Sequence, residues 1–417
     1  GPADSIYAVQ QSREPLDIRL GMGSTLAAFV AASGGGSVGQ YGPLVHFGAT
    51  MTEILLKYIR IKIDRRVFIA CGVAGAISAG FNAPIAGVLF AHEALLRRIS
   101  VGAIAPIAIT SIVAYAANQA FFNIEPTFSV PDMPIELQPL IPFLIMTAFL
   151  SAASAVAYMA AIRKGRELAT RSQWSMPKLI FSCVLVVGCV GVVLPDITGL
   201  GLTQVNQMID AQFTLGMLVI LLAAKIFVTA YCLNTGFFGG VFGPALFVGA
   251  ATGAIAAYLA VMMGLAPHLS YALPVAAIAA VGGAVIGAPL AVIMIVIELT
   301  GSYAYGLSAM LCVILCSVLT LRLFGLSYFD RQLLDRGIDL RLGQEHVELS
   351  LTPVREIQGG DFVRLSNDAS VEQARQALRD ALATEAYVCD DAGTLVGKID
   401  IHSLTHATSL TAALDPS

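Results

Sequence analysis

The sequence predicts an all-α membrane protein that crosses the bilayer several times, with two inverted halves and broken or short tilted helices, followed by a small α+β domain. Of its 417 residues 57% are hydrophobic and only 12% are charged, whereas a soluble domain carries about 25% charged residues. Several apolar runs are long enough to cross most of a bilayer. A glycine-rich motif also occurs twice, once at position 39 and again at position 240.

The composition argues against several other classes of protein. A net charge of −4 gives no indication of a nucleic-acid partner. The seven cysteines include no Cys-x-x-Cys pair, so we expect neither a metal site nor a disulfide framework. Because no nucleophile–base or metal-ligand cluster occurs at a useful spacing, we expect a protein that is not an enzyme and requires no cofactor.

A glycine-rich loop at residues 34–43, with the sequence GGGSVGQYGP, precedes a helix that we expect over residues 44–57. The N–H groups and the dipole at the N-terminus of a helix attract anions. Irregular backbone at membrane depth is tolerated only where protein buries it or where it lines a cavity. The loop therefore indicates an anion pathway, and the same pattern returns in Gly240-Val241-Phe242-Gly243-Pro244.

The other apolar segments follow in order, and several are shorter than the roughly 20 residues of a full crossing. Residues 1–20 contain no long apolar run, and residues 195–214 are expected to be a loop. Short segments at corresponding places in two halves point to a binding site near the bilayer midplane. We expect the helices to cover residues 21–33, 44–57, 67–80, 85–96, 101–117, 140–162, 179–194, 215–231, 245–263, 273–283, 290–299 and 303–323.

A second repeated motif supports two homologous halves, at about residues 1–165 and 175–340. Ala83-Pro84 followed by Glu93 matches Ala288-Pro289 followed by Glu298. Basic and acidic loops alternate, so the positive-inside rule places the loops at 57–66, 97–98 and 163–178 and the C-terminal region in the cytoplasm. The helices after the two glycine motifs then end on opposite sides of the membrane. Their N-termini would meet at one central point, where backbone N–H groups could hold an anion without a full positive charge.

Four motifs in this order resemble the CLC family of chloride channels and chloride/proton exchangers. They are Gly-Gln-Tyr-Gly-Pro at 39–43, Phe-Asn-Ala-Pro at 81–84 with Glu93, Gly-Gly-Val-Phe-Gly-Pro at 239–244, and Ser-Tyr at 327–328. The resemblance covers residues 1–340 and implies chloride as the transported ion, a lipid bilayer as the environment and a homodimer with one pathway per subunit. It also places the family's anion-binding serine upstream of Gly1, so we expect a chain that lacks early segments, with a tag remnant as the other explanation of Gly1-Pro2.

Two departures from the family pattern concern protons. The family's gating glutamate is replaced by Tyr41, with Gln40 in place of an arginine, and the inner proton glutamate of many exchangers is replaced by Ala94. A phenol with a pKa near 10 is a poor proton shuttle at pH 7. We therefore expect passive chloride conduction, with a chloride/proton exchanger that uses other proton carriers as the alternative.

The resemblance also implies the residues that contact the anion. Tyr41 would close the pathway with its ring or offer its hydroxyl, the alternative being a packed tyrosine, and the Tyr328 hydroxyl would contact the anion from the inner side. The predicted anion-binding residues are Gly39, Gln40, Tyr41, Gly42, Gly240, Val241, Phe242 and Tyr328.

Four other polar residues lie in the apolar part of the sequence. Glu93 and Glu298 are functional candidates by default, but their symmetry favours a structural role at helix ends. Lys225 would either raise the local potential for anions or extend toward the membrane surface. We expect His46 to be an interior histidine with its hydrogen bonds satisfied.

Residues 346–417 are expected to form a separate cytoplasmic domain after a membrane domain over 1–345. Strands are predicted at 362–365, 386–389 and 395–401, with a helix that Ser370 caps. The segments 352–357 and 393–399 resemble a CBS domain, a module that normally works in pairs and often binds adenine nucleotides. One copy favours dimerisation or stability, and nucleotide sensing with residual transport remains a third reading. A bacterial inner membrane is the expected location.

Overall fold

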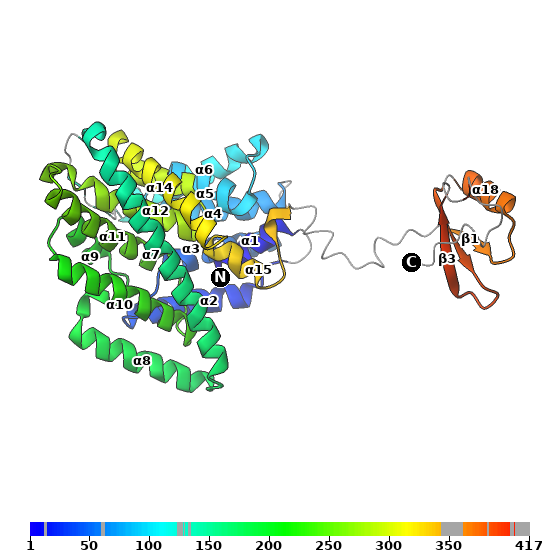
Figure 1. The fold of residues 1–417 in the computed structure, drawn as a ribbon, viewed down its shortest axis with the longest axis horizontal. Coiled ribbons are helices and arrows are strands. Elements are labelled where there is room, and N and C mark those ends of the chain that lie inside the picture. Colours follow the sequence, from blue (N-terminus) through cyan, green and yellow to red (C-terminus); the bar gives the residue numbers. More distant parts are fainter. Residues whose placement is uncertain are drawn as a thin grey trace. The chain divides into compact units, whose positions relative to one another are not determined.

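The computed structural model describes residues 1–11, 15–59, 63–122, 128, 130–131, 135–342, 362–381, 383–400 and 404. The chain forms two compact units, Gly1–Glu348 and Leu349–Ser417. The first unit is a bundle of helices packed side by side, with α8 at its edge (Figure 1). Seven helices in the described part of the chain are long and apolar enough to cross a membrane. The predicted helical membrane fold is therefore confirmed.

Helices of the first half lie close to the predicted positions, and backbone chemistry explains where they break. Asn82 ends α4 in the left-handed conformation with φ of 56°, and Pro84 begins α5, where its missing N–H removes no intrahelical bond. The elements are α1 (Pro2–Gln10), α2 (Ile18–Ser33), α3 (Tyr41–Tyr58), α4 (Arg65–Phe81), α5 (Pro84–Phe90), the π-helix η1 (Ala91–Leu96), α6 (Val101–Phe122) and α7 (Leu137–Arg171).

The second half repeats this arrangement. Gly287, with φ of 81°, ends α12 and Pro289 begins α13, as Asn82 and Pro84 do in the first half. The elements are α8 (Met176–Val193), η2 (Pro195–Ile197), α9 (Leu202–Ile209), α10 (Leu215–Asn234), α11 (Phe242–Met262), η3 (Pro267–Leu269), α12 (Ala272–Ile286), α13 (Pro289–Thr300), α14 (Tyr303–Leu323), α15 (Tyr328–Leu334) and η4 (Leu340–Leu342).

Helix α9 occupies part of the predicted loop 195–214, so that prediction is wrong, and α1 lies within residues 1–20, where no helix was predicted. Helix α1 buries Ile6 and Val9 within residues 1–20, and α9 buries Val205 and Met208 within residues 195–214. Both helices are too short to produce a long apolar run. A third difference is α7, which continues past residue 162 through a charged stretch where Glu167 lies one turn from Arg163.

Glycines allow the same close helix contact in both halves. A Cβ at Gly48 of α3 would lie 2.4 Å from the carbonyl oxygen of Gly72 on α4, and one at Gly249 of α11 would lie 2.7 Å from the carbonyl oxygen of Ala277 on α12. Small residues let membrane helices approach this closely. The repeated contact fixes the two helices that follow the glycine motifs.

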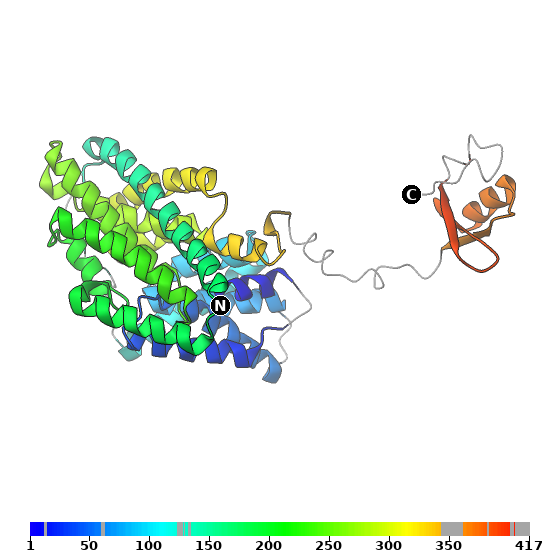
Figure 2. The ribbon, with the colours of Figure 1, turned by 60° about the horizontal axis from the view of Figure 1, so that its bottom comes forward.

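The second unit is a three-stranded sheet in the order β1-β2-β3, with helix α18 on one face (Figure 2). Its elements are β1 (Val363–Ser366), α18 (Val371–Asp380), β2 (Glu385–Cys389) and β3 (Leu395–Asp400). Strands β1 and β2 are parallel and β2 and β3 are antiparallel. Ser370 caps α18 as predicted.

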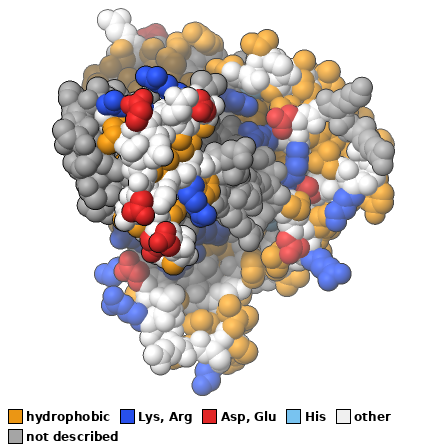
Figure 3. Space-filling model, turned by 90° about the vertical axis from the view of Figure 1, so that its right-hand side faces the viewer, with side chains coloured by type: hydrophobic (Ala, Val, Ile, Leu, Met, Phe, Trp, Pro, Cys, Tyr) orange, Lys and Arg blue, Asp and Glu red, His pale blue; other side chains and the backbone are white. Residues whose placement is uncertain are grey.

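Segment 352–357 lies outside the described residues, as do residues 60–62 of the basic loop and residue 401 of the last predicted strand. In the space-filling view of Figure 3, acidic and basic side chains are interspersed among apolar ones.

Candidate functional site

The two glycine motifs join at the centre of the first unit. Gly39 N–H donates to the Gly240 carbonyl and Gly240 N–H donates to the Gly39 carbonyl, each over 2.7 Å, in an isolated antiparallel bridge. A Cβ at Gly39 would lie 2.8 Å from both the Gly240 oxygen and the Gly243 nitrogen, so glycine is required there. The bridge brings the two halves into direct backbone contact.

Helices α3 and α11 begin immediately after this bridge. Their first intrahelical bonds run from Leu44 N–H to the Gln40 carbonyl and from Ala245 N–H to the Val241 carbonyl. N–H groups in the first turn of a helix have no acceptor within the helix. The amides of Gly39 and Gly240 are engaged with each other, so donors to an anion must come from the residues that follow them in each motif.

Three aromatic rings, which we call the aromatic cluster, fill the space beside these helix ends. Tyr41 stacks on Phe81 with ring centroids 3.9 Å apart, and Phe242 meets Tyr41 and Phe81 edge-on at 5.7 and 5.5 Å. Tyr41, Phe81 and Phe242 are 2%, 0% and 4% exposed. Tyr41 and its counterpart Phe242 in the other half thus contact each other directly, and both also contact Phe81 at the end of α4.

A cavity of about 450 Å³, the arginine-lined cavity, reaches this region from one side. Gly240, Val241 and Tyr328 form part of its wall. An apolar pocket lies against Phe81 and Phe242. The charged residues that line the arginine-lined cavity are Arg163, Arg166, Arg331, Arg336, Asp4 and Asp335.

The arginines give this cavity an excess of positive charge. Arg336 pairs with Asp4 at 2.6 Å and Arg331 with Asp335 at 3.5 Å. Among the described residues, no carboxylate lies within ion-pair distance of Arg166. An excess of one sign of charge in a cavity raises the local concentration of oppositely charged ions.

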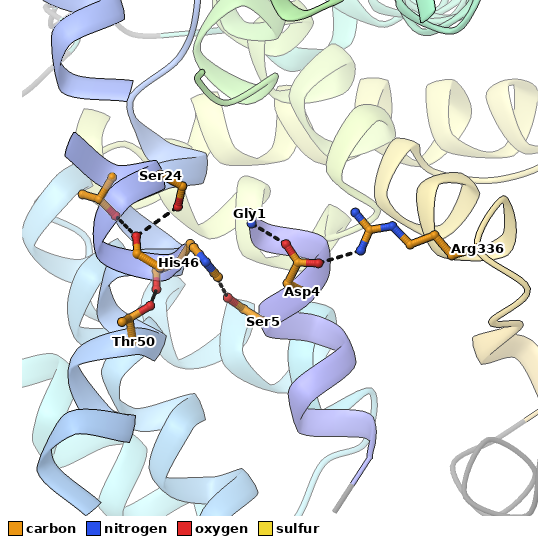
Figure 4. A network of polar contacts seen from close by, with 9 residues as sticks. Gly1, Asp4, Ser5, Ser24, His46, Thr50 and Arg336 are labelled. Carbon is orange, nitrogen blue, oxygen red and sulfur yellow. Dashed lines mark hydrogen bonds and ion pairs between the residues drawn. The ribbon is translucent and has the colours of Figure 1, made fainter. Parts of the chain in front are cut away.

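One wall of the cavity is a polar network between α1, α3 and the segment after α15 (Figure 4). Asp4 points from α1 to Arg336, and Ser5 Oγ lies 2.7 Å from His46 Nδ1. The Thr50 hydroxyl donates to the His46 carbonyl. His46 is therefore an interior histidine whose Nδ1 has a partner.

Tyr158 of α7 belongs to the site but was missed by the sequence analysis. Its buried hydroxyl donates to the Val241 carbonyl over 2.8 Å and fixes the backbone at the start of α11. Ser37 and Thr229 make a similar buried contact of 2.9 Å between the two halves. Burial of a hydroxyl in an apolar helix signals that a partner exists, but not which residue it is.

Each of the two intramembrane glutamates, Glu93 and Glu298, caps the start of a helix in the opposite half. Glu298 accepts hydrogen bonds from the N–H groups of Ile85 and Ala86, both 2.8 Å long, at the start of α5. Glu93 accepts from Leu290 and Ala291 over 3.1 and 2.9 Å at the start of α13. Each half therefore supplies the carboxylate that caps a helix of the other half.

Lys225 and Ala94 lie in the interior. Lys225 neither extends to the surface nor joins the aromatic cluster, because its ammonium donates to the carbonyls of Ile197 and Gly199 and lies 4.7 Å from the Phe247 ring centroid. The expected extension to the membrane surface is therefore wrong, whereas an effect of Lys225 on the local potential stays a prediction. Ala94 is buried in η1.

The family model described as "Voltage gated chloride channel" matches residues 1–321. A "Putative chloride channel protein ClcB-like" from Ralstonia nicotianae is 26% identical over 281 residues, 66% of this chain and 66% of the relative. An "H(+)/Cl(-) exchange transporter ClcA" from Vibrio cholerae is 30% identical over 231 residues, 53% of this chain and 49% of the relative. The chain thus spans less than two thirds of the length of these relatives.

Solved structures share the fold. A "slow cyanobacterial Cl-/H+ antiporter" superimposes with a TM-score of 0.72 at 20% identity, covering 81% of this chain and 80% of that one. A "CLC-type fluoride/proton antiporter" gives a TM-score of 0.66 at 20% identity, covering 78% and 80%.

Proposed function

This chain belongs to the voltage-gated chloride channel family, and from that premise we propose that it conducts chloride or a similar small anion passively, without coupling to protons. The chain is an integral membrane protein. The single observation that carries the proposal is the side chain at the gate position. Tyr41 is packed in the aromatic cluster where the resemblance expects a carboxylate.

The pathway that we propose begins in the arginine-lined cavity. Arg166 and its neighbours concentrate anions there. The ion then meets the Tyr328 hydroxyl and the backbone N–H groups of Val241 and Phe242, which are weak donors suited to an ion that must also leave. Gln40, Gly42 and Tyr41 offer the corresponding groups from α3.

The aromatic cluster is the barrier in this pathway. Three buried rings in mutual contact lie beside the helix ends. A hydrophobic constriction can gate an ion pathway by excluding water. Conduction therefore requires the Tyr41 ring to move, and no proton has to move with it, because neither Tyr41 nor Ala94 carries a carboxylate.

We further propose a homodimer in a bacterial inner membrane, with the second unit in the cytoplasm. The resemblance supports the dimer, and the distribution of Lys and Arg supports the orientation.

The test is chloride efflux from liposomes that contain the purified protein, with the external pH recorded at the same time. Passive conduction predicts chloride efflux that needs an added potassium ionophore to balance charge and that carries no protons. Protein-free liposomes are the control. Uphill chloride movement driven by a proton gradient alone would overturn the proposal.

Proton-coupled exchange through other carriers is the second candidate. The Vibrio relative is named as an exchange transporter and both structural neighbours are named as antiporters, which favours this candidate. The same assay separates the two candidates, because exchange requires a fixed ratio of protons to chloride.

A further inference from the structure

We propose that Arg97 and Asp330 are positioning residues that hold Tyr328 at the arginine-lined cavity. This inference rests on the proposed function, because it assumes that the Tyr328 hydroxyl contacts the anion. The Arg97–Asp330 ion pair joins the two halves at a place outside the glycine motifs. Arg97 follows η1 in the first half, and Asp330 lies two residues after Tyr328 in α15 of the second half.

Asp330 organises the first turn of α15 with both of its carboxylate oxygens. Its Oδ2 accepts a hydrogen bond from the Ser327 hydroxyl over 2.9 Å, and its own N–H donates to Ser327 Oγ over 3.3 Å. Its Oδ1 accepts from the Arg97 guanidinium. Tyr328 is the first residue of this turn, so the ion pair fixes the backbone that carries its ring.

The backbone of Arg97 supports a role for its side chain. Arg97 ends η1 in the left-handed conformation, with φ of 54° and ψ of 21°. L-residues other than glycine, asparagine and aspartate rarely adopt this conformation, which is disfavoured for a long side chain. Glycine would satisfy the backbone better, so an arginine at this turn indicates that its guanidinium is needed.

The element η1, which precedes Arg97, is also held in place. Glu93, in η1, accepts the N–H groups of Leu290 and Ala291 at the start of α13. Just before α13, a Cβ at Gly287 would lie 2.8 Å from the Ser327 side chain. The elements η1, α13 and α15 thus form a closed set of contacts around the residue before Tyr328.

The ion pair contributes more to position than to stability. The Arg97 and Asp330 side chains are 28% and 20% exposed, and ion pairs near a surface contribute little to folding. Loss of the pair should therefore change the binding of the anion while leaving the protein folded.

The test measures the affinity for chloride by titration calorimetry of the full chain in detergent, with melting temperature as the measure of folding. Arg97→Gly removes the guanidinium and suits the left-handed backbone. We expect it to weaken chloride binding by about three- to tenfold, the value of one hydrogen bond. Arg97→Lys should restore most of the affinity. Arg98→Ala, which removes an adjacent exposed arginine, should leave affinity unchanged.

A double-mutant cycle with Tyr328→Phe separates positioning from a general structural effect. If Arg97 acts through the Tyr328 hydroxyl, Arg97→Gly should cost no further affinity in the Tyr328→Phe background. Additive losses, or wild-type affinity in Arg97→Gly while Tyr328→Phe is weakened, would overturn the inference alone. Unchanged affinity in Tyr328→Phe would overturn both the inference and the proposed role of Tyr328, whereas the efflux assay would still decide passive conduction.

Discussion

Tyr41 is the residue on which the proposed transport properties depend. Its ring has partners on both sides, Phe81 stacked at 3.9 Å and Phe242 edge-on at 5.7 Å. Phe81 ends α4 and Phe242 begins α11, so the ring is held between the two halves. A glutamate at this position would desolvate a charge among three apolar rings, whereas a tyrosine adds to their packing.

Tyr41→Ala should speed chloride efflux by about tenfold, because it removes two aromatic pairs of about 0.5–1.5 kcal/mol each from the closed state. The measurement is efflux from liposomes at a matched amount of protein. Tyr41→Phe, which keeps the ring, should remain slow. Tyr303→Ala is the matched control, since that tyrosine is 71% exposed. Unchanged efflux in Tyr41→Ala would show that the ring is not the barrier.

Gly39 lies where the contact between the two halves leaves no room for a side chain. Gly39→Ala would place its Cβ 2.8 Å from two backbone atoms and separate the bridge. We expect loss of at least about 2 kcal/mol of stability, from two broken backbone hydrogen bonds and overpacking, together with loss of efflux. Thermal unfolding in detergent and efflux are the measurements.

Gly188→Ala is the control for that substitution, because a Cβ at Gly188 of α8 meets no atom within 4 Å. Alanine inside a helix should stabilise this variant by about 0.5–1 kcal/mol. Equal behaviour of the two variants would argue against a special role for the bridge.

Helices α5 and α13 depend on carboxylates from outside their own half. Glu298 and Glu93 each accept two N–H groups at a helix start. These acceptors combine hydrogen bonding with the favourable interaction between a carboxylate and a helix N-terminus. The pair therefore ties the first half to the second at two equivalent points.

Glu298→Ala should lower the stability by about 1–3 kcal/mol, because it leaves two N–H groups of α5 without their acceptor. Glu167→Ala is the control, since its pair with Arg163 is exposed at 3.6 Å and should be worth less than about 1 kcal/mol. Thermal unfolding of both variants in detergent measures the difference. A loss no larger in Glu298→Ala than in Glu167→Ala would remove the capping role.

The elements that the sequence predicted well are those whose signal is local. Long apolar runs located α6, α8, α10 and α14 (Val101–Phe122, Met176–Val193, Leu215–Asn234 and Tyr303–Leu323) to within a few residues. Helices α1 and α9 were missed, because a helix of eight or nine residues has too few apolar positions for a run to stand out. Their burial comes from neighbouring helices and not from their own composition.

The two units of the chain have separate cores. Ala374, Leu378 and Val388 form part of the core of the second unit, while the described contacts of the aromatic cluster and the arginine-lined cavity all lie within residues 1–336. A chain that ends after Leu342 should therefore retain chloride efflux close to that of the full chain.

Efflux from the shortened and full chains, each with and without millimolar ATP, tests this expectation. A response to ATP that disappears on shortening would support the nucleotide-sensing alternative. Loss of efflux in the shortened chain at an unchanged melting temperature would show that the second unit is needed for conduction.

The sequence by itself determined the membrane fold and the repeated motifs, and the family resemblance predicted that Tyr41 stands in place of a gating glutamate. These conclusions depend on composition, on hydrophobic run length and on the order of motifs, all of which are local properties of the chain. Spacing also brought Glu93 and Glu298 together as an equivalent pair.

Only the tertiary structure decided which groups meet. The Gly39–Gly240 bridge, the stacking of Tyr41 on Phe81, the capping partners of Glu93 and Glu298, the Tyr158–Val241 contact and the Arg97–Asp330 pair all join separate elements. Each partner lies far along the chain, and many buried polar groups could have satisfied the same need. The packing of the two inverted halves selects one set of partners, and that selection places the glycine-rich loop of one half against that of the other.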